Sequence, residues 1–132
     1  MLILGVSALF FFSAFLNANA ADYYVDATSG VDGATGISVS DTWQTIAKVN
    51  STILVPGDNI YFKRGETWNE QLDIIVSGTE GNLITFGAYD LGKFLIIDAQ
   101  SSRDYAISFV DDLSYIRLEN LRVQNATTRN LW

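Results

Sequence analysis

The chain has 132 residues, a length that suits one domain. It carries 15 acidic and 8 basic residues, for a formal net charge of −7, and the charges are scattered. Nucleic acids and anionic membranes select basic faces, so this balance argues against both as partners. The sequence has no cysteine, no histidine and no phosphate-binding loop. The chain therefore lacks the residues that are needed for disulfide bonds, zinc sites, Ser-His-Asp or Cys-His catalysis and nucleotide binding.

An apolar segment opens the chain. Residues 2–16 are apolar or small, and Ala18-Asn19-Ala20 fits the small-x-small rule for cleavage. This predicts a signal peptide over residues 1–20, cut between Ala20 and Ala21, and a secreted or cell-envelope location. No Lys or Arg precedes the run, so an uncleaved membrane anchor is the alternative, although a spanning helix needs about 20 apolar residues.

Residues 21–57 are predicted to form an N-terminal strand, a loop and a capping helix. Residues 23–26 are β-prone, and the Gly, Ser, Thr and Asp of residues 28–38 are typical of tight corners. Ser40-Asp41-Thr42 is a helix-start signal, and an apolar stripe follows. We expect a helix over residues 43–48, ending near 50–52, that covers the N-terminal end of the repeat that follows.

The stretch 56–65, PGDNIYFKRG, reads as one alternating strand between two corners. Its inward pair returns after 24 and again after 23 residues, as Ile60 and Phe62, Ile84 and Phe86, then Ile107 and Phe109. A second set at 22-residue steps is Ile74, Ile96 and Leu118. A chain that returns to the same inward positions at a nearly constant period is typical of stacked coils.

The fold class that this repeat predicts is all-β, a right-handed parallel β-helix, with its first coils in residues 58–132. Strands are expected at 59–63, 72–76, 83–86, 94–97 and 106–110, with a strand pair at 115–123, and turns at 65–67 and 87–92. A sandwich or barrel would more often show two-residue hairpins between its strands. The predicted interior consists of Ile60, Phe62, Leu72, Ile74, Ile84, Phe86, Ile96, Ile107, Phe109, Ile116, Leu118, Leu121 and Val123.

A family likeness rests on the order YYVD, DTWQTIAKVN, PGDNIYFKRGETW, SGTEGNLITFGAYDLGKFLIID and YIRLENLRVQNA. Over residues 23–126 the chain resembles the N-terminal part of secreted right-handed parallel β-helix proteins of the pectate-lyase-like superfamily. The resemblance implies a polysaccharide-degrading lyase or glycoside hydrolase in full-length form, monomeric, with Ca²⁺ as a cofactor that some members use. A non-catalytic surface or adhesion protein is the alternative. No residue here matches a catalytic, substrate-binding or metal-binding motif of the family.

The chain stops at Trp132 inside a repeat that looks set to continue, so it is expected to be a fragment without the coils that carry chemistry. Its outward positions show no recurring acidic column beside a basic one. The fragment is therefore expected to be catalytically inert, marginally stable and prone to associate through its open C-terminal end.

Four acidic residues could ligate Ca²⁺, which takes six to eight oxygen ligands. They are Asp26 and Asp32 of the N-terminal part and the adjacent pair Asp111 and Asp112, for which a catalytic role is also considered. Asx-turns and corner positions explain the same residues without a metal, and this interpretation is favoured.

Basic and aromatic residues offer two routes to sugar recognition. Lys63 and Arg64 could clamp a carboxylated sugar, although capping or a salt bridge is favoured for them. Stacking faces could come from Tyr61, Trp68, Tyr89, Tyr105 and Tyr115, which could equally cover corners of the fold.

Asparagines near the strand ends are predicted to form hydrogen-bonded stacks between coils, namely Asn59, Asn82, Asn120 and Asn125. Asn50-Ser51-Thr52 and Asn125-Ala126-Thr127 match the glycan acceptor pattern, which matters only in a glycosylating host.

Overall fold

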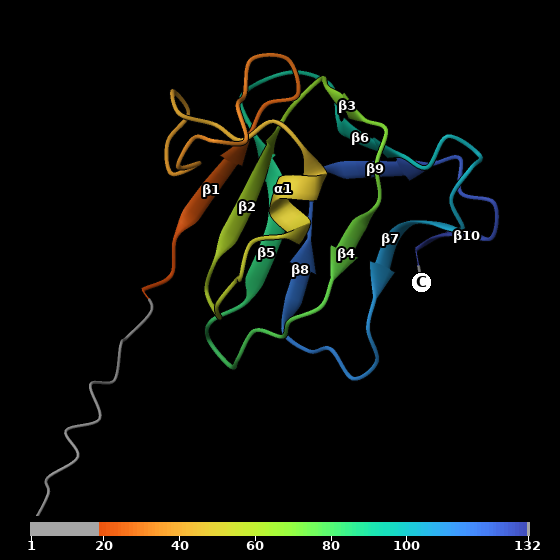
Figure 1. Cartoon of the computed structure of the whole chain (residues 1–132). Helices are drawn as coiled ribbons and strands as arrows, with labels where there is room; N and C mark the ends of the chain where they lie inside the picture. The colour runs from red at the N-terminus through yellow and green to blue at the C-terminus, as the bar shows by residue number, and fades with distance from the viewer. Residues whose placement is uncertain (1–18, 132) are drawn as a thin grey trace, which may run out of the picture.

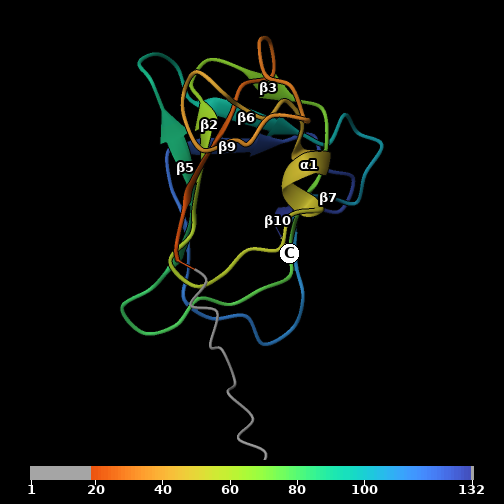
Figure 2. The ribbon, with the colours of Figure 1, turned by 60° about the vertical axis from the view of Figure 1, so that its left-hand side comes forward.

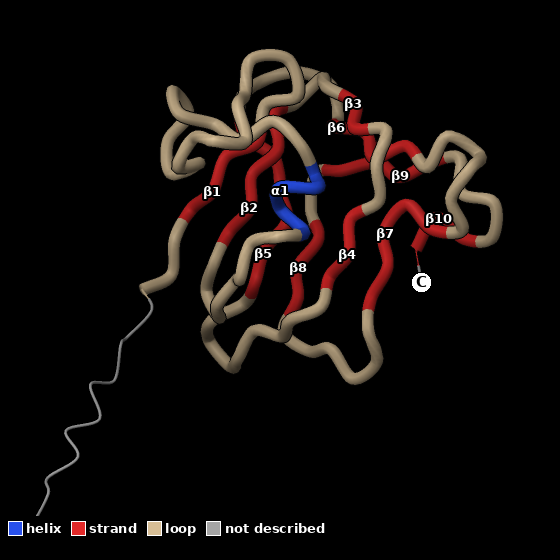
Figure 3. The backbone as a smooth tube through the Cα atoms, viewed as in Figure 1, coloured by secondary structure: helices blue, strands red, loops and turns tan. Residues whose placement is uncertain are grey.

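The computed structural model describes residues 19–131. The predicted signal peptide therefore lies almost entirely outside the described residues, and its cleavage stays a prediction. Among the described residues no helix has the length and apolar character needed to cross a membrane. What the structure describes is nearly all β, with one short helix (Figures 1 and 3).

The strands form three parallel sheets. The first sheet contains, in spatial order, β1 (Asp22–Val25), β2 (Asn59–Lys63), β5 (Ile84–Tyr89) and β8 (Ile116–Leu118). The second contains β3 (Thr67–Trp68), β6 (Leu95–Asp98) and β9 (Leu121–Gln124). The third contains β4 (Leu72–Ile74), β7 (Tyr105–Phe109) and β10 (Arg129–Leu131).

From β2 onward the chain visits the first, second and third sheets in that order, three times over. Each of these circuits pairs in parallel with the one before it, and β1 pairs with β2 ahead of them. Figure 2 shows the sheets facing one another around a shared interior. The nearly all-β, parallel architecture is the one expected from the sequence, and it is consistent with a β-helix-like fold.

Several predicted boundaries need correction. β3 occupies part of the predicted 65–67 turn, and β10 was not predicted at all. β4 ends at Ile74 rather than at 76, and β6 and β7 are each shifted by one residue. The predicted turn at 87–92 is wrong at its start, because Gly87, Ala88 and Tyr89 extend β5 by pairing with Tyr61, Phe62 and Lys63.

The predicted repeat assigns the wrong pairs of neighbouring residues to adjacent strands. In the first sheet Ile60 pairs with Phe86 and Phe86 with Leu118, steps of 26 and 32 residues. Ile107 pairs with Leu72 of the third sheet, 35 residues earlier. The corners between strands differ in length, so equivalent positions return at unequal intervals. A nearly constant period of 22 to 24 residues therefore aligned positions that are out of register, as for Ile60 and Ile84, or that belong to different sheets, as for Ile84 and Ile107.

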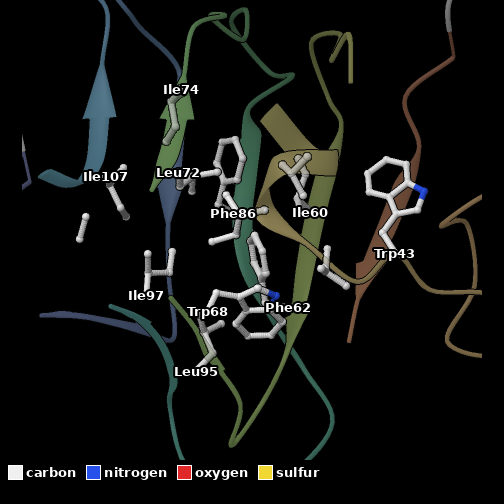
Figure 4. Packing of buried hydrophobic residues seen from close by; sticks show 14 of the residues in the cluster. Trp43, Ile60, Phe62, Trp68, Leu72, Ile74, Phe86, Leu95, Ile97 and Ile107 are labelled. Carbon is white, nitrogen blue, oxygen red and sulfur yellow. The ribbon is translucent and has the colours of Figure 1, made fainter. Parts of the chain in front are cut away.

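The interior is a single apolar cluster to which all three sheets contribute (Figure 4). Seven predicted core residues are fully or almost fully buried: Ile60, Phe62, Leu72, Ile74, Ile84, Phe86 and Ile107. Phe109, Ile116, Leu118, Leu121 and Val123 are half-buried and pack against the cluster. The predicted inward position of Ile96 is wrong by one residue, because its neighbours Leu95 and Ile97 point inward in β6. The prediction omitted Val25, Trp43, Ile46, Val49, Leu54, Trp68, Leu95, Ile97, Ala99 and Ala106.

The helix begins later than predicted. α1 covers Ile46–Asn50, and its N-cap is Thr45, whose hydroxyl accepts a hydrogen bond from the Lys48 amide. Trp43 lies before the helix in extended backbone, where it forms a parallel bridge with Val25. The start is displaced because Trp43 stacks on Tyr23, at 4.6 Å between ring centroids, and its amide bonds to the Tyr24 carbonyl.

The helix packs against the apolar cluster and the third sheet. Ile46 and Val49 are buried in the common cluster, and α1 lies beside β4 (Figure 1). The Asn50 side chain donates to the Gln71 carbonyl at 3.0 Å and accepts from the Asp73 amide at 3.0 Å. One side-chain amide thus satisfies the open edge of β4 as a neighbouring strand would.

Candidate functional site

The outward face of the first sheet carries three of the side chains considered for sugar recognition, namely Tyr61, Lys63 and Tyr89. Because side chains alternate along a strand, the register decides which of them become neighbours. Tyr24 lies beside Tyr61, and Tyr61 beside Gly87. Gly87 is buried although it faces outward, since Tyr61 and the Glu119 side chain cover it.

Three tyrosines from three adjacent strands form a cluster on this face, which we call the tyrosine cluster: Tyr24, Tyr61 and Tyr89. The rings of Tyr24 and Tyr61 are tilted, with centroids 5.7 Å apart. Tyr89 meets Tyr24 edge to face at 5.3 Å. These separations lie in the range for favourable aromatic pairs, so the rings hold one another in place.

An open hollow of about 560 Å³ lies at the end of this cluster, and we call it the tyrosine hollow. Tyr24 and Tyr89 line one part of it, and Lys63, the last residue of β2, also lines it. The complete lining is Tyr24, Asp26, Val39, Lys63, Tyr89 and Asp90. Aromatic walls with a few polar groups are typical of small-molecule sites.

Lys63 and Asp26 form an ion pair inside the hollow. The Lys63 Nζ atom donates to the Asp26 carboxylate at 2.8 Å, and the Asp26 side chain is only 8% exposed. Burial raises the pKa of Asp26, but hydrogen bonds from Lys63 and from the amides of Ser29 and Thr28 outweigh burial and lower that pKa overall. The same hydrogen bond and the Asp26 charge raise the pKa of Lys63.

The Tyr61 and Tyr89 hydroxyls stay protonated over a wide pH range, because the pKa of each is raised. Burial, followed by the charges of Asp26, Glu66 and Asp90, raises the pKa of Tyr89 far above its ordinary value. Burial and then the Asp22 charge raise the pKa of Tyr61. Both phenols can therefore donate hydrogen bonds at neutral pH.

Two smaller hollows lie at the two ends of the first sheet. One of about 180 Å³ shares Asp26 and Val39 with the tyrosine hollow and is walled by the 29–42 loop. Another, of about 390 Å³, lies at the opposite end of the first sheet, where Asn59, Thr85 and Arg117 line it. The outward face is therefore hollowed at both ends of its strands.

A different hollow, of about 250 Å³, lies between α1 and β4 and is mainly apolar. Its exposed aliphatic side chains include Ile53 and Ile75. Asn50 and Asp73, two of its polar residues, are already joined by hydrogen bonds that close the β4 edge. It offers little to a polar ligand.

Two of the four residues considered for Ca²⁺, Asp26 and Asp32, have protein partners. Asp26 accepts from two backbone amides besides Lys63, as the Asx-turn interpretation predicts. Asp32 accepts from the amides of Gln44 and Thr45 and from the Thr45 hydroxyl. Asp111 and Asp112 are exposed in the turn after β7. Among residues 19–131 there is no group of three or more Asp or Glu residues placed to hold a metal ion.

The other aromatic residues that were predicted as stacking faces lie in different parts of the fold. Trp68 is excluded as a stacking face, because it is 2% exposed and packs edge to face on Phe62 at 5.1 Å (Figure 4). Tyr105 is half-buried in the third sheet, and Tyr115 is exposed in the turn before β8. Only Tyr61 and Tyr89 of the predicted set reach the tyrosine cluster.

The predicted asparagine stacks are wrong in their partners. Asn59 donates to Asp22 at 2.8 Å, and Asn125 to Asp98 at 3.0 Å, so both bond to an aspartate of the preceding circuit. Asn120 and Asn125 adopt positive φ values of 58°, which asparagine tolerates at a corner. Asn50, one predicted glycan acceptor, uses its side-chain nitrogen at the β4 edge.

Sequence reasoning missed Tyr24, Val39 and Asp90. One signal could have found Tyr24: aligning Asp22 with Asn59 brings Tyr24 onto Tyr61 and Asp26 next to Lys63. Val39 and Asp90 lie in loops, whose paths carry no periodic signal.

Comparison with solved structures finds similar folds. A GH136 lacto-N-biosidase from Eubacterium ramulus superposes with a TM-score of 0.73 at 25% identity, over 80% of this chain and 20% of that one. A rhamnogalacturonan lyase gives a TM-score of 0.61 at 21% identity, over 79% of this chain and 28% of that one. No protein-family model matches the chain. No curated protein matches it. The chain thus spans a fifth to about a quarter of the length of these neighbours.

Proposed function

We propose that this chain is the N-terminal part of an extracellular right-handed parallel β-helix protein that binds polysaccharide, with the outward face of the first sheet as its glycan-binding surface. The tyrosine cluster carries this proposal. Tyrosine rings bury the apolar faces of sugar rings, while protonated phenols and neighbouring carboxylates bond to sugar hydroxyls. The two structural neighbours, both named as glycan-cleaving enzymes, support a carbohydrate role for the fold.

The full-length protein is proposed to be a lyase or glycoside hydrolase whose reacting groups lie outside this chain. A non-catalytic surface or adhesion protein is the alternative. The polar face alone serves either role, since binding and cleavage both begin with sugar recognition. A longer reading frame discriminates between them: convergent acidic and basic residues on later coils favour an enzyme, and an anchoring module favours adhesion.

Affinity electrophoresis tests the proposal. The 132-residue chain is run through gels that contain galactan, xyloglucan, pectate, alginate or chondroitin, and at least one polysaccharide is expected to retard it. Tyr61→Ala should reduce the retardation severalfold, because it removes one of the three rings, the one that packs against Tyr24. Tyr115→Ala is the matched control, an exposed tyrosine outside the cluster. Migration unaffected by every polysaccharide, or an equal loss in both variants, would contradict the proposal.

A further inference from the structure

We infer that the tyrosine hollow takes an uncharged sugar ring and disfavours a uronate, because Asp26 already holds the lysine that could have bound a sugar carboxylate. This inference rests on the proposed glycan-binding function and specifies the class of sugar. The sequence permits a clamp on a carboxylated sugar for Lys63 and Arg64 but favours capping or a salt bridge, and Lys63 forms such a salt bridge with Asp26.

The shape of the hollow suits one sugar ring. Tyr24 and Tyr89 meet edge to face, so the hollow has an aromatic wall, and Val39, which is 63% exposed, adds an apolar patch. The volume of about 560 Å³ lies within the range of small-ligand sites. A pyranose ring presents C–H groups to such a wall and hydroxyls to its rim.

The polar groups of the hollow match sugar hydroxyls. Asp90 is exposed, and its carboxylate can accept hydrogen bonds from a ligand in addition to the one from its neighbour Leu91. The Tyr89 phenol remains protonated and can donate. A hydroxyl both donates and accepts, so neutral sugars satisfy these groups without bringing a charge.

The charges of the hollow oppose a carboxylate. Among the described residues that line it, Asp26 and Asp90 are acidic and Lys63 alone is basic. Lys63 is held at 2.8 Å by a carboxylate that is almost fully buried, so the cation is neutralised by a partner that cannot move away. Glu66 adds a further negative charge near Tyr89. A uronate would therefore meet net negative potential.

Matched ligand pairs test the inference. Isothermal titration calorimetry on the 132-residue chain compares galactotriose with trigalacturonate, cellotriose with triglucuronate, and mannotriose with trimannuronate. We expect a neutral trimer to bind, and its acidic counterpart to bind at least about tenfold more weakly. Tyr89→Ala should weaken the neutral trimer about tenfold, Tyr89→Phe less so, and Tyr115→Ala not at all.

Two charge variants test the cause. Asp26→Asn keeps an oxygen for the amides of Thr28 and Ser29 but releases Lys63, so binding of the acidic trimer should rise severalfold. Asp90→Asn removes the same charge from the hollow without releasing Lys63, and asparagine tolerates the φ of 69° at this position. It should raise acidic binding less. An equal effect of both variants would overturn the role of the ion pair.

The outcomes separate the inference from the proposed function. Acidic trimers that bind the unchanged chain as tightly as their neutral counterparts would overturn this inference and leave glycan binding in place. If neither the trimers nor the polysaccharides bind, both are overturned. Should Tyr89→Ala fail to fold by circular dichroism, the comparison of matched ligands on the unchanged chain still decides.

Discussion

Ile84 is fully buried in β5 and lies beside Ile116 of the next circuit. An asparagine here would place an amide without partners inside the apolar cluster. We expect Ile84→Asn to lower the free energy of unfolding by about 2–4 kcal/mol, measured by urea denaturation. Ile75→Asn is the control, since Ile75 is 64% exposed, and it should change stability by at most about 0.5 kcal/mol. Equal effects would contradict the assigned interior.

The Asp26 carboxylate makes the stability of the fold depend on pH. Because its pKa is lower in the folded chain than in the unfolded one, the pairing stabilises the fold above about pH 4 and is lost as pH falls through the folded pKa. The stability difference between the wild type and Asp26→Asn should therefore be largest near neutral pH and shrink below about pH 4. Thermal melts from pH 2 to 7 measure it. A difference that grows toward low pH would show that the lowered pKa is wrong.

At the scale of elements, the 26–43 loop is held by close backbone approach at Gly30. A Cβ atom at Gly30 would lie 2.0 Å from the Trp43 carbonyl oxygen and 2.5 Å from that of Asp26. Both are backbone atoms, so the loop itself would have to move. We expect Gly30→Ala to destabilise the fold by about 2 kcal/mol or more and to disturb the wall of the tyrosine hollow.

Gly33→Ala is the matched control in the same loop, because a Cβ there meets nothing within 4 Å. It should be neutral or slightly stabilising, since alanine restricts the unfolded chain more than glycine does. Urea denaturation of both variants checks the pair. Similar stabilities for the two would contradict the packing of Gly30 against Trp43.

In the molecule as a whole, the acidic groups described on the outward face of the first sheet do not converge on one point. They are distributed: Asp26 is paired with Lys63, Asp22 accepts from Asn59, and Glu119 lies over Gly87. Glycan cleavage needs acid, base and charge-stabilising groups that converge on one bond. We expect the 132-residue chain to release no unsaturated products or reducing ends from pectate, alginate or chondroitin, with or without Ca²⁺. Turnover of any of them would show that a complete site lies on this face.

Strand alternation in stretches such as 59–63 was sufficient to predict strands and seven of the 17 buried hydrophobic residues among the described residues, and the return of inward pairs along the chain predicted the parallel arrangement. The reason is local: a period of two assigns each side chain to one face of its strand. The tertiary structure decided which strands became neighbours. Corner lengths set the register, and register brought Tyr24 and Tyr89 together and Asp26 to Lys63. It also buried Trp68 against Phe62 of the same circuit, and no pattern along the chain distinguishes an inward aromatic ring from an outward one in so short a strand.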